Sequence, residues 1–234
     1  MGDESYRWAS IMTRLYIICE GQSEQEFVDG ALAPYIRGIN PNLDISSPIL
    51  KSKTKNQSHK GGCVSYHRLK LYIETFNKQE RCLITTLVDY YGLENDFPDY
   101  RVIQTIPNVY NRIEKLESTI ASHIQLSNFI PYIQIHEYEM FYFADLDNFI
   151  NLDAELNKIY NEFIAVNTQT DNPELINDGI HSAPSKRIEK FFNKIDLKYK
   201  KPYYAALYSQ SCNIEILRNK CRHFNAWLEK LLAL

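Results

Sequence analysis

Uninterrupted apolar runs at three points of the chain predict strands that are buried on both faces. Apolar or β-branched side chains predominate in residues 15–19, 82–88 and 131–135, and none of these residues is charged. Runs without polar alternation are typical of parallel sheets that helices cover on both sides. A fourth strand is predicted over residues 43–50, where Pro48 interrupts the pattern.

Helical periodicity appears between and after these runs. Ser23, followed three residues later by Glu26, predicts a capping box at the start of the first helix. The predicted helices cover residues 24–37, 64–77, 107–126, 140–149, 153–166, a segment beginning at 184, and 213–232. Strands alternating with helices predict an α/β fold, a mostly parallel sheet flanked by helices, with a helical C-terminal portion. We expect residues 1–14 to be an extension and residues 15–234 to form one domain.

The composition narrows the class of protein. With 234 residues and 44% hydrophobic content, the chain is expected to be globular, with one sizeable core. No apolar run approaches the roughly 20 residues that cross a membrane, and residues 1–12 do not resemble a signal peptide. Five cysteines, two of them in predicted strands, favour free thiols and a cytoplasmic location. The net charge is −3, so any contact with nucleic acid requires local basic patches.

Acidic residues follow the three clearest strands. Glu20 comes directly after the first, Asp89 after the second, and Glu137 and Glu139 after the third. Because the carboxyl ends of parallel strands meet at one edge of a sheet, these side chains are expected to lie together. Carboxylates at close range repel one another unless they bind a cation or keep a proton. Oxygen ligands of this kind favour Mg²⁺ or Mn²⁺.

The acidic candidates, and nearby histidine and basic residues that could act with them, also have ordinary structural interpretations. Asp89 is equally suited to cap a turn, and His136 to be a hydrogen-bonded core histidine. Glu139 is a favourable residue at a helix N-terminus, because its charge opposes the helix dipole. Lys186 and Arg187 are alternatively part of a solvated helix face.

Two basic segments are candidate contacts for a phosphate backbone, with a solvated loop as the alternative. Four lysines lie in the loop 51–62, and a second basic run spans residues 198–201. The candidate phosphate contacts are Lys51, Lys53, Lys55, Lys60, Arg187, Lys200 and Lys201.

This pattern resembles the Toprim fold of topoisomerases, primases and OLD-family nucleases. In that fold a Glu follows the first strand, an Asp-x-Asp motif follows a later strand, and further acidic residues complete a Mg²⁺ site. Glu20, with Gly21 and Glu24, matches the first motif. Asp89 matches half of the second, because Tyr91 stands where the second Asp is expected.

More closely, the chain resembles a bacterial Toprim-like family, domain-of-unknown-function family 4276. The segments that carry this resemblance are residues 19–24, 88–92, 135–139, 172–179, 183–188 and 221–225. Relatives are often encoded beside an AAA-type or ABC-type ATPase in settings that suggest anti-phage defence. The resemblance therefore implies a Toprim-like α/β domain over residues 15–234 and a nuclease effector that works with an ATPase partner.

The resulting prediction is a metal-dependent nuclease acting on DNA or RNA. The predicted metal ligands are Glu20, Asp89 and Glu137, with Glu24, Glu139 and Asp178 as secondary candidates. Lys186 is expected to stabilise the transition state. His136 is a candidate acid or base, because the ordinary pKa of histidine lies near working pH.

A non-enzymatic partner or sensor subunit is the main alternative. The Tyr91 departure and the net negative charge favour it. In this alternative, the abundant tyrosines of the chain would serve protein contacts, in which tyrosine is enriched. A primase-like polymerase is less favoured, because the chain contains no P-loop or similar nucleotide-binding motif.

Overall fold

The sheet contains five parallel strands in the computed structural model, which describes residues 12–50, 63–169, 172–176 and 182–234. The strand order is β2-β1-β3-β4, and β5 also pairs with β3. The strands are β1 (Thr13–Cys19), β2 (Leu43–Ser46), β3 (Cys82–Asp89), β4 (Phe129–Ile130) and β5 (Ile133–Gln134). The pairings β1–β2, β1–β3, β3–β4 and β3–β5 are all parallel, which confirms the predicted α/β class.

Strand β1 contributes to two hydrophobic cores, one on each face of the sheet. Leu15, Ile17 and Cys19 are fully buried in the first core. Tyr16 and Ile18 point to the opposite face and belong to the second. Because neighbouring side chains of a strand alternate between faces, burial on both sides requires an unbroken apolar run.

The third predicted strand is divided into β4 and β5. Pro131 lies between them and has no backbone N–H to offer the sheet. The side chain of Thr86, on β3, compensates for this break. Its hydroxyl donates to the carbonyl of Tyr132 (2.7 Å) and accepts from the amide of the same residue (2.9 Å). The chain therefore stays beside β3 to the end of that strand.

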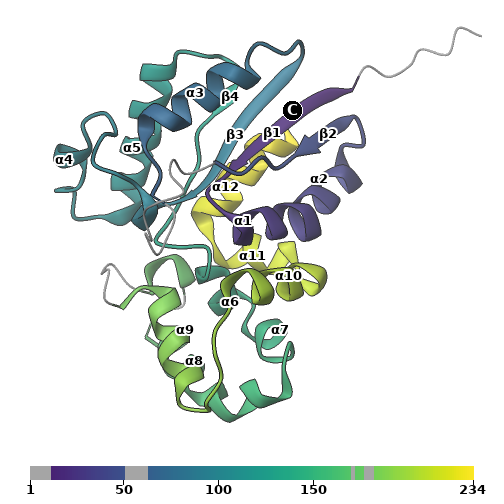
Figure 1. The fold of residues 1–234 in the computed structure, drawn as a ribbon, viewed down its shortest axis with the longest axis vertical. Coiled ribbons are helices and arrows are strands. Elements are labelled where there is room, and N and C mark those ends of the chain that lie inside the picture. The colour runs from purple at the N-terminus through teal and green to yellow at the C-terminus, as the bar shows by residue number, and fades with distance from the viewer. Residues whose placement is uncertain (1–11, 51–62, 170–171, 177–181) are drawn as a thin grey trace, which may run out of the picture.

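Helices cover both faces of the sheet (Figure 1). The second core lies under α3 (Tyr66–Phe76), α4 (Tyr100–Ile103) and α5 (Val109–Ile124). The first core lies under α1 (Gln22–Phe27), the π-helix η1 (Val28–Leu32), α2 (Ala33–Ile39), α11 (Ile214–Lys220) and α12 (Arg222–Leu232).

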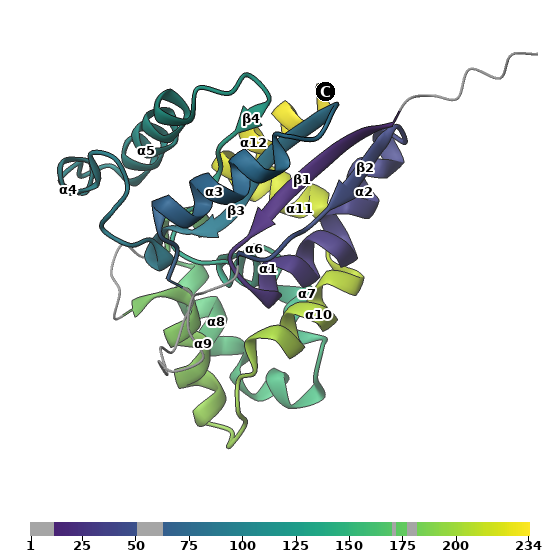
Figure 2. The same ribbon diagram turned by 45° about the horizontal axis from the view of Figure 1, so that its top comes forward.

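A helical portion lies beyond the C-terminal ends of the strands, and Figure 2 shows the same arrangement from a second direction. It comprises α6 (Met140–Ala144), α7 (Leu146–Ile150), η3 (Ala154–Ile159), α8 (Tyr160–Asn167), η4 (Pro173–Leu175) and α9 (Pro184–Asn193). The chain then returns through α10 (Lys201–Ser211), which packs on α1 and η1. The strand ends that carry acidic residues thus face this helical portion. Within the described ranges, no helix is long and apolar enough to span a bilayer.

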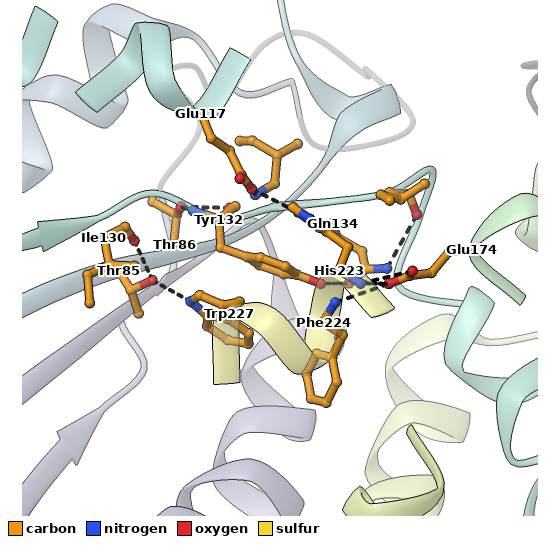
Figure 3. A network of polar contacts seen from close by, with 12 residues as sticks. Thr85, Thr86, Glu117, Ile130, Tyr132, Gln134, Glu174, His223, Phe224 and Trp227 are labelled. Carbon is orange, nitrogen blue, oxygen red and sulfur yellow. Dashed lines mark hydrogen bonds and ion pairs between the residues drawn. The ribbon is translucent and has the colours of Figure 1, made fainter. Parts of the chain in front are cut away.

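The single closing helix predicted over residues 213–232 is wrong. The chain breaks at Cys221, whose φ of −117° and ψ of 92° are extended, and this separates α11 from α12. The fully buried carboxylate of Glu174 causes the break (Figure 3). It accepts the amides of His223 and Phe224, each at 3.0 Å, which belong to the first turn of α12. Since amides of a first turn lack partners within their own helix, an acceptor from elsewhere stabilises a new helix start.

A buried network continues from this helix start to the sheet (Figure 3). The His223 ring bonds the Glu117 carboxylate at 2.9 Å and stacks on Tyr132, which in turn stacks on Trp227. Trp227 donates its indole N–H to the hydroxyl of Thr85 on β3 (2.8 Å). The C-terminal helix is therefore tied to the central strand by directional bonds as well as by apolar contact.

Candidate functional site

The ends of β1 and β3 bring two acidic residues together. A carboxylate oxygen of Glu20 accepts the backbone amide of Asp89 at 3.0 Å. Gly92 lies against this carboxylate, and a β-carbon there would come within 2.6 Å of both of its oxygens. A glycine is needed here because any side chain would displace the carboxylate. The predicted approach of these two strand ends is thus present, with Gly92 shaping it.

Asp89 and Glu137 each accept a backbone amide from another segment. Asp89 is 7% exposed, and its Oδ1 accepts the amide of Tyr138 at 2.9 Å. Glu137 accepts the amide of Ser185, in the first turn of α9, at 3.0 Å. These bonds connect the loop after β5 to the end of β3 and to the helical portion.

Glu24 and Glu139 complete the group of carboxylates. Glu24 lies on α1, is 6% exposed, and accepts the amide of Gly21 at 2.8 Å. Glu139 is 1% exposed and binds the ammonium of Lys201 at 2.9 Å and the hydroxyl of Tyr199 at 3.2 Å. We call Glu20, Glu24, Asp89, Glu137 and Glu139 the carboxylate cluster.

Burial and mutual repulsion disfavour the charged form in this cluster. Burial, and then the charge of Glu24, raise the pKa of Glu20 to about 8. Burial likewise raises the pKa of Glu24 to about 7, and the charge of Glu139 contributes. Burial and the neighbouring carboxylates hold the pKa of Asp89 well above its ordinary value. The cluster therefore retains protons near neutrality, and a cation would relieve the repulsion.

The donor chemistry of the cluster fits a hard divalent ion, because every candidate ligand is a carboxylate oxygen. In the part of the chain that the structure describes, however, no three acidic, histidine or cysteine side chains are already grouped as metal ligands. Binding an ion would require carboxylates to turn toward a common point.

Tyr142 lies completely buried beside the cluster. The charges of Glu139 and Glu24 add to burial in raising the pKa of its hydroxyl. Side-chain hydrogen bonds with Tyr199 and Tyr138 offset part of that rise. The polar surroundings of this hydroxyl are therefore tyrosine hydroxyls as well as carboxylates.

A comparison with family models covers almost the whole chain. Residues 19–232 match the model described as Domain of unknown function (DUF4276). The chain belongs to this family. The part that matches the DUF4276 model contains the entire carboxylate cluster and Lys201. Searches of curated proteins and of solved structures found no match.

Two predicted catalytic residues of this DUF4276 domain lie in different settings. His136 is buried, has a φ of 62°, and lies against Tyr91, with 5.3 Å between the ring centroids. It is thus close to the end of β3. Lys186 lies on the exposed side of α9, where it pairs with Glu189 at 2.8 Å. Among the residues that the structure describes, the lysine paired with the cluster is Lys201 instead.

The remaining candidates are distributed around the site or fall outside the described ranges. Arg187 donates to the carbonyl of Ser182 at 2.9 Å, and Lys200 is exposed just before α10. The candidates that lie outside the described residues are Lys51, Lys53, Lys55, Lys60 and Asp178.

Sequence reasoning missed the contacts that α9 and α10 make with the cluster. It assigned Lys201 to phosphate binding and gave no role to Tyr199, Ser185 or Gly92. Pro184 marked the start of α9 correctly. No local pattern indicates which carboxylate that helix start will meet, because Glu137 is 48 positions away from Ser185.

Proposed function

We propose that this DUF4276 chain is a Toprim-like nuclease that uses a divalent metal ion to hydrolyse phosphodiester bonds of DNA or RNA. The observation that carries the proposal is the convergence of five carboxylates near the carboxyl ends of parallel strands, where the pKa values of Glu20, Glu24, Asp89 and Glu139 are raised. An acidic residue after β1 beside one after β3 is also the arrangement that the Toprim resemblance implies.

The ion is proposed to be Mg²⁺ or Mn²⁺, held by Glu20, Asp89 and Glu137, with Glu24 and Glu139 close by. Such an ion supplies a Lewis acid and a lowered pKa for bound water. The chain itself orients the ligands: backbone amides hold Glu20 and Asp89 in place, and Gly92 leaves room for the Glu20 carboxylate.

A polyanionic substrate is supported by the charge around the cluster. The segment 186–201 contains seven lysines and arginines and two acidic residues, although the whole chain is net negative. The helix that carries the first part of this segment, α9, begins at the cluster, where Ser185 donates to Glu137. The segment also ends there, on the ion pair between Lys201 and Glu139. A phosphate backbone attracted by this segment would lie next to the carboxylates.

An ATPase partner and a role in anti-phage defence belong to the same proposal. They rest on the family resemblance, which places such domains beside AAA-type or ABC-type ATPases. Cleavage under control of a partner is consistent with a cluster whose carboxylates are not yet grouped around one point in the described chain.

A second candidate function is that of a catalytically inactive subunit in such a complex. Two observations favour it: Tyr91 replaces the second Asp of the motif, and Lys201 already neutralises part of the cluster. This candidate predicts a stable complex with an ATPase and no binding of divalent ions.

The experiment that tests the nuclease proposal compares cleavage of single-stranded and duplex DNA and RNA with and without Mn²⁺. Wild type is expected to cleave only with the metal, and Glu20→Gln to lose activity about 100-fold or more while keeping its circular dichroism spectrum. Glu155→Gln, at an exposed ion pair on η3, is the matched control and should cleave normally. Full activity in Glu20→Gln would refute the assigned mechanism.

A further inference from the structure

Lys201 brings a positive charge into the carboxylate cluster. Its ammonium lies 2.9 Å from Glu139 Oε1. Burial alone would lower the pKa of this lysine, but the charges of Glu139, Glu137 and Asp89 outweigh that effect and raise it. The lysine thus interacts with three members of the cluster, although it comes from the first residue of α10.

The two partners of this ion pair differ in their access to water. The side chain of Glu139 is 2% exposed, so the lysine replaces the water that would otherwise solvate its charge. The side chain of Lys201 is 42% exposed. A lysine has a long flexible stem, so its ammonium can move into solvent without moving α10. The lysine is therefore the member of the pair that can leave.

Binding a divalent ion would require this contact to change. The ammonium feels the charges of Asp89 and Glu137 as well as that of Glu139, so an ion held by Asp89 and Glu137 would repel it. The lysine and the ion would therefore compete for the negative charge of the cluster.

We propose that Lys201 is a tethered cation that neutralises the cluster in the metal-free protein and leaves Glu139 when a divalent ion binds. The inference rests on the proposed metal-dependent function and adds its regulation, because the ammonium of Lys201 competes with the metal ion for the carboxylates. Lys201 is a positioning residue in this scheme, because it acts through Glu139.

The test is a Mn²⁺ titration followed by thermal unfolding, on wild type and on Lys201→Met, which removes the charge and keeps most of the stem. The metal-free variant should melt below wild type, because Glu139 loses its counter-charge. Its half-saturating Mn²⁺ concentration should be about tenfold lower, the effect of removing one charge-assisted contact. Lys201→Arg should stay close to wild type.

Lys194→Met is the matched control. Lys194 also pairs with a glutamate, Glu162, at 2.6 Å, and its side chain is 45% exposed. This ion pair involves no member of the cluster, so removing it should leave the Mn²⁺ midpoint unchanged. Asp89→Asn removes one carboxylate of the cluster, so the part of the thermal shift that this variant loses comes from an ion bound there.

The outcomes separate this inference from the function on which it rests. Asp89-dependent binding in wild type with equal or weaker binding in Lys201→Met would overturn the tethered-cation proposal and leave the metal site in place. Absence of Asp89-dependent binding in both proteins would overturn both the tethered-cation proposal and the metal site.

If Lys201→Met does not fold, a second measurement on wild type replaces it: the rate at which an acylating reagent modifies Lys201, followed by mass spectrometry. Mg²⁺ should raise its labelling rate several-fold, and an unchanged or lower rate would refute the release.

Discussion

Replacing Glu174 by alanine should strongly destabilise the protein, although this residue lies outside the carboxylate cluster. Its carboxylate is fully buried and accepts three groups: the hydroxyl of Tyr110 at 2.7 Å and the amides of His223 and Phe224 at 3.0 Å. The substitution removes the acceptor that starts α12 and leaves these donors buried (Figure 3).

The magnitude follows from those contacts. Loss of a helix cap costs about 1 kcal/mol. A buried hydroxyl left without an acceptor costs about 1–3 kcal/mol, and the cavity left by the side chain adds to this. We expect a loss of about 4 kcal/mol in the free energy of unfolding, a large share of the 5–15 kcal/mol typical of a domain. Glu174→Gln keeps the volume and one acceptor, so it should lose about half as much.

Urea denaturation measures this effect. With a slope near 2 kcal/mol per molar urea, the alanine variant should unfold at about 2 M less urea than wild type. Hydrogen exchange should quicken first at the amides of His223 and Phe224, even in Glu174→Gln. A matched change at an exposed helix start, Glu155→Ala, should cost less than about 1 kcal/mol. If the two alanine variants were equally stable, the explanation of the α11–α12 break would be refuted.

Three further predictions concern charge and shape. Burial lowers the pKa of His223, but the hydrogen bond and charge of Glu117 outweigh it, so the folded pKa lies above the unfolded value. The resulting stabilisation of the folded protein is present in full below about pH 6.5 and is lost as pH rises through the folded pKa. Urea midpoints measured from pH 5.5 to 9 should show this dependence in wild type, and Glu117→Gln should flatten it. Gly92→Ala should push the Glu20 carboxylate out of place and weaken Mn²⁺ binding about tenfold in a thermal titration. Lys190 is an exposed lysine of α9 within the basic segment 186–201, and Lys190→Gln should weaken binding of a nucleic-acid strand and reduce the slope of affinity against salt by about one.

Two of these predictions have a matched control variant. Gly38→Ala, at a helical position with nothing within 4 Å of the added methyl group, should bind Mn²⁺ like wild type. Lys158→Gln, which removes an exposed lysine paired with Glu155, should leave the salt slope unchanged. A pH profile that is the same with and without Glu117 would contradict the contact between Glu117 and His223. Equal Mn²⁺ affinity in Gly92→Ala and Gly38→Ala would contradict the contact between Gly92 and the Glu20 carboxylate.

The sheet and two members of the site could be predicted because their determinants are local. Burial on both faces forces an apolar run in β1 and in β3, and parallel pairing then places Glu20 beside Asp89. Those facts follow from strand periodicity and from the direction of the chain. The interruption at Pro131 is equally local, but the hydroxyl of Thr86 that compensates for it at Tyr132 lies on a strand 46 positions earlier.

The partners that complete the site could not be predicted, because they arrive from distant segments. The basic run at 198–201 suggested phosphate binding, yet Lys201 is paired with Glu139, 62 positions before it. The break in the last helix shows the same limit. Residues 213–232 have the periodicity of one helix, and only the carboxylate of Glu174 reveals why a new helix begins at Arg222. Both are tertiary contacts of buried charges, which leave no periodic signal in the sequence.

Titration of Mn²⁺ against thermal unfolding, on wild type and Asp89→Asn, tests the proposed metal site most directly. At a free concentration about 100 times its Kd, an ion bound at the strand ends adds about 2.7 kcal/mol of stability. For a chain of this size, that corresponds to a rise of about 5–11 °C in Tm. Wild type should show this rise, and Asp89→Asn should start at an equal or higher Tm without metal and fail to respond, because it has lost both a ligand and a repelling charge. No rise in wild type, or the same rise in both proteins, would contradict a metal ion at the carboxylate cluster.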